Sequence, residues 1–223
     1  MLVKKFSLRL VCCVCVFSMG LGLGAKVWAD DSPMTEMDPD VAKEWGGKIS
    51  EQFVKQNKEL PVKIDADADK AVGLVNADTQ EGILLVPLKG FREETEGPKD
   101  AEKDRGIGLC YVFMSPSFKP LADGKPADAK RLRIMKFKDG EGNEHDTVCL
   151  VCSVKHVEGD DWQLMVFSGD NEPLSKNSFE EATDAPKADL ALTMKDVKDD
   201  KATLVINMFG KYCTTIPLGH KAK

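Results

Sequence analysis

Histidine and the large aromatic residues are scarce in this chain. Of its 223 residues, three are His, three are Trp and two are Tyr. The three histidines form no HExxH zinc motif, and no serine stands in a nucleophile elbow. The sequence therefore predicts no catalytic residue, no cofactor and no bound metal, and it favours a binding or structural role over catalysis.

Long apolar runs are also absent after the first 29 residues. The N-terminus begins with Lys4, Lys5 and Arg9, continues with an uncharged stretch over residues 10–25, and has Ala29 before Asp30. A basic start, an apolar run and a small residue at the cleavage point are typical of a secretory signal peptide. An uncleaved anchor is the alternative, but glycines weaken the end of the run. Residues 1–29 are thus predicted to be a signal peptide, and the protein is expected to be secreted or periplasmic. The cleaved chain is expected to have no membrane span.

Basic residues are outnumbered in the rest of the chain. Four of the 31 Lys and Arg lie in the first 29 residues, whereas all 37 Asp and Glu follow them. An acidic surface repels phosphate backbones and anionic lipid. Nucleic acid is therefore a poor partner, and an envelope protein or a polysaccharide is expected instead.

One helix is predicted in residues 30–60. Asp38 can cap it, and Val41, Trp45, Ile49 and Phe53 recur every four residues on one stripe. Pro61 forbids its continuation. This segment is expected to pack on the domain that follows.

After Pro61 the pattern changes to about nine short apolar or alternating runs separated by turn residues, as strands require. They span residues 71–77, 83–88, 107–114, 132–138, 147–157, 162–167, 190–197, 203–209 and 212–218. The predicted fold is mainly β, an antiparallel β-sandwich or open barrel with one N-terminal helix. The β-rich domain is expected over residues 61–219, with a flexible tail over 220–223.

Three longer stretches are predicted as connections. Residues 92–105 are mostly charged, which favours a solvated loop. Residues 115–130 contain three prolines and are also predicted as loop. Residues 169–187 are predicted to be a connection with a short helix around 177–182.

Two imidazoles and two thiols form a symmetrical pattern, His145, Cys149, Cys152 and His156. On a helix they would share one face and could bind zinc. The intervening residues are rich in β-branched side chains and predict a strand, where each His and its nearest Cys are about 13 Å apart along the chain. The pattern therefore predicts no metal site, and Cys149 and Cys152 are too far apart in a strand to bond to each other.

Four cysteines remain after the predicted cleavage, and an even number in an oxidising compartment favours disulfides. Alternation along the strand places Cys152 on the apolar face and Cys149 on the other. Cys149 is therefore the preferred cross-strand partner, bonded to Cys110 or Cys213, and Cys152 is expected to be a buried thiol.

Two further features have ordinary structural explanations. The run from Asp65 to Asp69 imitates the start of a calcium loop, but Lys70 and Asn76 replace the required Gly and Glu, so an acidic turn is expected. The aromatic residues Trp45, Tyr111 and Trp162 could be sugar platforms, but their positions predict core packing.

The sequence as a whole predicts an exported, non-catalytic binding or structural module of the cell envelope. Carboxylates are abundant, so a carboxylate-based secreted hydrolase, with or without calcium, stays open as the alternative.

Overall fold

The computed structural model describes residues 34–91, 105–139, 142–157, 161–182, 186–198 and 200–220. The predicted signal peptide and all but the last residue of the charged segment 92–105 lie outside these ranges. No helix in the described part of the chain is long and apolar enough to cross a membrane.

The helix α1 (Pro39–Gln56) begins where the sequence predicts. The Asp38 side chain accepts hydrogen bonds from the backbone N–H groups of Asp40 and Val41, and Pro39 occupies the first turn. Asn57 ends the helix by donating its side-chain amide to the carbonyl of Phe53.

The described residues form fourteen strands in two antiparallel sheets, which confirms the predicted mainly β sandwich. The eight-stranded sheet has the order β1-β2-β3-β4-β8-β9-β10, with β7 also paired to β8. Its strands are β1 (Met34–Glu36), β2 (Val72–Asn76), β3 (Gly82–Pro87), β4 (Ile107–Met114), β7 (Arg133–Lys138), β8 (Glu144–His156), β9 (Trp162–Phe167) and β10 (Ser175–Ser178).

The six-stranded sheet has the order β12-β13-β14-β5-β6, with β11 paired to β14. Its strands are β5 (Phe118–Ala122), β6 (Lys125–Pro126), β11 (Glu180–Glu181), β12 (Leu190–Lys198), β13 (Lys201–Met208) and β14 (Tyr212–His220). Two short 3₁₀ helices, η1 (Ala68–Lys70) and η2 (Ala129–Arg131), complete the described elements.

All nine predicted strands are present, but two of the predicted connections contain further strands. Residues 115–130, expected as loop, hold β5 and β6, where Pro126 is tolerated on a two-residue edge strand. The short helix expected around 177–182 is wrong, because β10 pairs with β9 and β11 pairs with β14. Pairing to an open sheet edge satisfies this backbone in a way that local sequence does not reveal.

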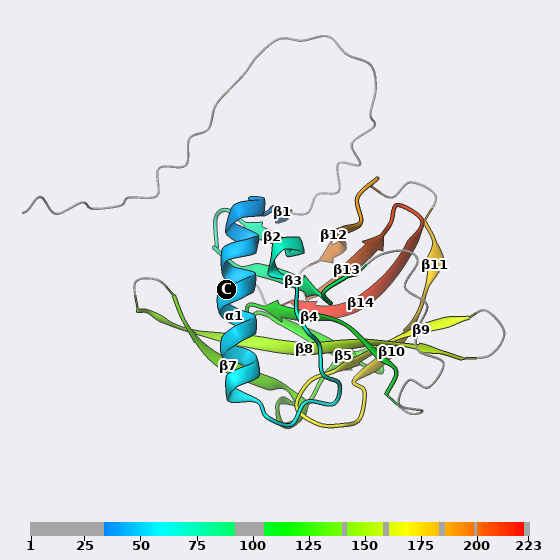
Figure 1. The fold of residues 1–223 in the computed structure, drawn as a ribbon, viewed down its shortest axis with the longest axis horizontal. Helices are drawn as coiled ribbons and strands as arrows, with labels where there is room; N and C mark the ends of the chain where they lie inside the picture. Colours follow the sequence, from blue (N-terminus) through cyan, green and yellow to red (C-terminus); the bar gives the residue numbers. More distant parts are fainter. Residues whose placement is uncertain are drawn as a thin grey trace, which may run out of the picture.

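The molecule has three layers, with α1 on one face of the eight-stranded sheet and the six-stranded sheet on the other (Figure 1). Alternate residues of the central strands enter two separate cores. In β4, Val112 and Met114 pack between the sheets, whereas Tyr111 and Phe113 pack under α1. The central strands are thus buried on both faces, and neither face is a solvent face.

Candidate functional site

An open groove lies between α1 and the end of β7. Its volume is about 390 Å³. The helix contributes one wall and β7, with the residue that follows it, contributes the other. The lining residues are Lys48, Glu51, Gln52, Lys55, Phe137, Lys138 and Asp139.

Helical periodicity explains the first wall. Residues 45, 48, 52 and 55 recur at intervals of three or four and so lie along one flank of α1. The neighbouring flank carries Ala42, Ile49 and Phe53 into the core. The Gln52 amide donates to the carbonyl of Lys136 at 2.8 Å, which links this wall to β7.

A polar junction fixes the other wall. Strand β8 pairs with β7 through its first half and with β9 through its second half. Ser168 follows β9, donates its hydroxyl to the carbonyl of Cys149 and accepts from the N–H of Arg133. The Arg133 guanidinium in turn donates to the side chain of Asn57 at the end of α1. Hydrogen bonds of Arg133 therefore connect the end of α1 and the start of β7 to Ser168.

Trp45 stands beside the groove, which corrects the expectation that it is a core residue. Its side chain is 38% exposed, and its ring lies 5.4 Å from that of Phe137, tilted by 45°. Phe137 itself is buried and provides an apolar floor. Gly46 faces the layer beneath the helix, close to Ala71 and Val86, and Trp45 lies on the flank.

The lysines of the groove have carboxylate partners. Lys48 lies 2.5 Å from Glu44, and Lys55 lies 2.6 Å from Glu51. Lys138 lies 3.4 Å from Glu144, whose pKa is lowered by hydrogen bonds from Lys138 and Lys136. A hydrogen bond from Lys55 likewise lowers the pKa of Glu51.

Asp139 is bound within its own turn. Its carboxylate lies 2.9 Å from Nε2 of His145 and accepts from the backbone N–H of Asn143 at 2.8 Å. The groove is therefore a mixed surface of one exposed indole, one buried phenyl ring, an amide and balanced charges.

The four residues of the His and Cys pattern do not meet. Strand β8 confirms the predicted extended conformation, with His145 near its start, close to Asp139, and His156 at its end, 5.1 Å from the ring of Trp162. Among the described residues, no three His, Cys, Asp or Glu side chains are grouped as metal ligands. The acidic turn is used structurally, since Asp67 caps η1 and Asp69 pairs with Lys43.

The cysteines are arranged differently from the expectation. All four described cysteines are free thiols. Cys149 lies in the core under α1, whereas Cys110 lies between the sheets, so the preferred bond between them has no geometric basis. Cys213 is partly exposed on β14, opposite Asn207 and Glu180. Alternation along β8 does separate Cys149 from Cys152, but the face that carries Cys149 is covered by α1, and local sequence does not reveal that cover.

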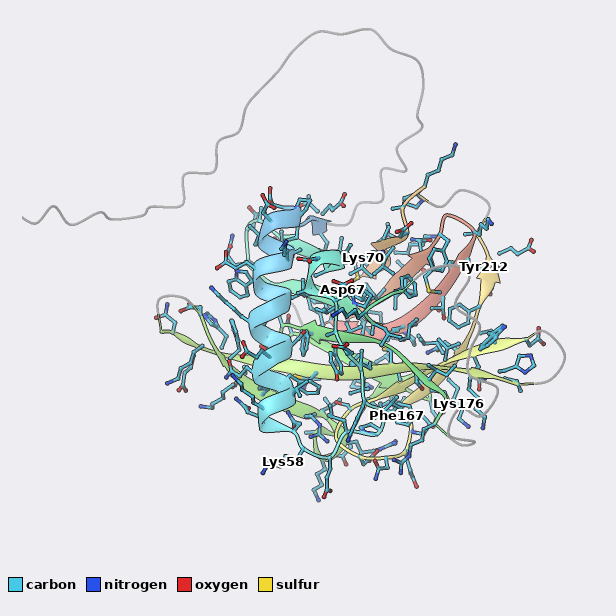
Figure 2. The ribbon with its side chains drawn as sticks, viewed as in Figure 1. Lys58, Asp67, Lys70, Phe167, Lys176 and Tyr212 are labelled. Carbon is cyan, nitrogen blue, oxygen red and sulfur yellow. The ribbon has the colours of Figure 1, made fainter. Side chains whose placement is uncertain are left out.

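Trp162 corrects a second expectation about aromatic residues, because it is 38% exposed at the start of β9 rather than in the core. Tyr111 is buried as expected, and its hydroxyl donates to the carbonyl of Ile64. Tyr212, at the start of β14, is exposed on the side of the molecule away from α1 (Figure 2).

Sequence reasoning missed a polar contact at one end of the sandwich. His220, expected in the flexible tail, ends β14, stacks on Phe118 at 4.8 Å and lies 3.6 Å from the buried Glu81. One carboxylate oxygen of Glu81 has no hydrogen-bond partner. No sequence signal marked this contact, because it joins strands far apart in the chain.

Comparisons with protein-family models, with curated proteins and with solved structures find no match for this chain.

Proposed function

We propose that this protein is an exported, non-catalytic binding module of the cell envelope, and that the groove between α1 and β7 binds a neutral polysaccharide. The observation that carries the proposal is the exposed indole of Trp45 beside the groove, supported by Phe137. The apolar face of a sugar ring packs on such an aromatic side chain. A tryptophan has only two side-chain torsions, so little conformational entropy is lost when binding orders it.

The charges of the groove favour a neutral ligand. Each lysine of the lining has a carboxylate partner, so neither a polyanion nor a polycation finds an excess of opposite charge there. The Gln52 amide, the ammonium groups and the carboxylates are suited to hydrogen bonds with sugar hydroxyls. A peptide of either strong charge fits this balance less well.

The proposed export of the protein rests on the residue pattern at its N-terminus. The basic start, the apolar run and Ala29 support export with removal of residues 1–29. Mass spectrometry of the protein from its native host should show Asp30 as the first residue. A full-length species retained in the membrane contradicts this part of the proposal.

A polysaccharide hydrolase is the second candidate, because Glu51 and Asp139 both line the groove. Such an enzyme needs one carboxylic acid that stays protonated to donate to the leaving group. The lowered pKa of Glu51 opposes that role, and Asp139 is engaged by His145. The binding function is therefore favoured.

The experiment compares alanine variants of two tryptophans whose side chains are equally exposed. Trp45→Ala removes the platform at the groove, and Trp162→Ala removes an equally exposed indole on β9. Binding to dextran, cellulose and xylan, with anionic alginate as the contrast, is measured by affinity electrophoresis and calorimetry. We expect the W45A variant to lose on the order of tenfold or more in affinity for a neutral polysaccharide, with W162A unchanged.

Three results contradict the proposal. They are equal losses in both variants, tighter binding of alginate than of every neutral polysaccharide, and no binding to any of them. Release of reducing sugar that disappears in Glu51→Gln or Asp139→Asn would establish the hydrolase instead.

A further inference from the structure

Cys110 and Cys152 lie directly opposite each other on neighbouring antiparallel strands. The register of β4 and β8 pairs them, next to an irregularity between Gly108 and Cys110. Both thiols lie in the core between the two sheets and are 1% and 0% exposed, respectively. The neighbouring Cys152 thiol, together with burial, raises the pKa of Cys110 well above its ordinary value.

This geometry suits a covalent link. Residues directly opposite in an antiparallel pair have Cα atoms about 4.5 to 5.5 Å apart. A disulfide spans Cα separations of roughly 4.4 to 6.8 Å. No shift of register between β4 and β8 is therefore needed to join the two sulfurs.

The other described cysteines lack such a partner. Cys149 belongs to the core under α1 and faces Phe113 of β4 in the register. Cys213 pairs with Asn207 on β13 and with Glu180 on β11. Among the described residues, Cys110 and Cys152 are the one cysteine pair placed opposite each other.

We propose that Cys110 and Cys152 form an intramolecular disulfide that fastens β4 to β8 when the chain folds in an oxidising compartment. The expectation that the chain folds in an oxidising compartment rests on the proposed function, whereas the pairing of the two cysteines rests on the strand register alone. This pairing differs from the sequence-based prediction, in which Cys149 bonds to Cys110 or Cys213.

The bond forms by thiol–disulfide exchange with a disulfide oxidant, such as oxidised glutathione or the active-site disulfide of an oxidoreductase. One cysteine loses its proton, attacks the oxidant and forms a mixed disulfide while one oxidant thiol leaves. The second cysteine loses its proton, displaces the other oxidant thiol and closes the bond. Two protein thiols are thereby oxidised and the oxidant is reduced to two thiols.

Burial determines when this exchange can occur. The neighbouring Cys152 thiol and enclosure between the sheets raise the pKa of Cys110, and exchange requires an accessible thiolate. The bond therefore forms during folding, before the second sheet covers the pair. Once the protein has folded with both thiols reduced, the same oxidant has no access to them.

The test uses the purified protein refolded from urea in two buffers, one with reduced and oxidised glutathione and one with a phosphine reductant. Free thiols are alkylated after denaturation, and tryptic peptides are mapped without reduction. Trypsin leaves Cys149 and Cys152 in one peptide, so the Cys149→Ala variant is mapped in parallel to make the assignment unambiguous. We expect one crosslink between Cys110 and Cys152 in both proteins after oxidative refolding.

Two further measurements complete the test. The folded, reduced protein exposed to the same oxidised glutathione should keep both thiols free over the time in which refolding forms the bond. The melting temperature should rise by roughly 10 °C on oxidative refolding of the wild type and of C149A, with no rise in the Cys110→Ala/Cys152→Ala double variant.

A crosslink involving Cys149 or Cys213 overturns the proposal, as does the recovery of Cys110 and Cys152 as free thiols after oxidative refolding. Rapid oxidation of the folded, reduced protein overturns the assigned timing. These readouts do not involve polysaccharide binding or export, so their failure is distinct from a failure of the proposed function.

Discussion

A Cβ atom added to Gly46 would lie 2.8 Å from the Cβ of Ala71 and 3.3 Å from Cγ2 of Val86. Gly46 therefore lies at a close approach between α1 and the layer beneath it. The adjacent Gly47 differs, because its added Cβ would meet Ala68 at an ordinary 3.6 Å. Gly46 thus faces the layer beneath the helix, and the neighbouring Trp45 is exposed on the flank.

Gly46→Ala is expected to destabilise the protein and Gly47→Ala to stabilise it. Alanine is favoured over glycine in a helix interior by about 0.8 to 1.0 kcal/mol, which is the gain expected at position 47. At position 46 overpacking costs roughly 1 to 3 kcal/mol and outweighs that gain. Urea unfolding of both variants measures the two changes, and changes of the same sign would contradict the close packing at Gly46.

Ser168→Ala is expected to reduce the free energy of unfolding by about 1 to 3 kcal/mol, because the carbonyl of Cys149 and the N–H of Arg133 both lose a buried partner. Ser178→Ala, an exposed position on β10, serves as the control and should change little. Chemical denaturation compares the two variants. Equal stabilities would show that the junction of β7 and β9 does not depend on this hydroxyl.

Tyr111→Phe is expected to cost about 1 kcal/mol, since its buried hydroxyl donates to the carbonyl of Ile64 at 3.1 Å. Tyr212→Phe removes the hydroxyl of a side chain that is 42% exposed and should leave stability unchanged. Thermal unfolding of the two variants provides the comparison. If Y111F is as stable as the wild type, the hydrogen bond to Ile64 stabilises the folded state no more than a bond to water stabilises the unfolded state.

Cys149 is expected to make the protein less stable at alkaline pH. Burial raises its pKa from 9.0 to about 12. The unfolded state therefore loses the thiol proton first, and stability falls as pH rises from about 9 to about 12, by up to about 1.4 kcal/mol per pH unit. Below that range this group adds no pH dependence.

The Cys149→Ala variant should show a smaller slope of unfolding free energy against pH in that range. Cys213→Ala, which removes a partly exposed thiol, is the control. Urea titrations under reducing conditions at several alkaline pH values supply the slopes. The same slope in C149A and wild type would contradict the buried, protonated thiol.

The sequence by itself determined the elements whose signals are local. Asp38 and Pro39 marked the start of α1, and alternation with turn residues marked nine strands, because caps, turns and side-chain period act within a few residues. The antiparallel sandwich followed from short connections between neighbouring strands. The predicted signal peptide also comes from the sequence alone.

Only the tertiary structure decided which faces are covered. Strand β8 alternates regularly, yet whether Cys149 faces water or a helix depends on α1, which lies almost a hundred residues earlier in the chain. The same is true of Trp45, which is exposed although the adjacent Gly46 packs against Ala71. The pairing of Cys110 with Cys152 and the groove beside β7 both arise from contacts between distant segments, and local propensity carries no information about such contacts.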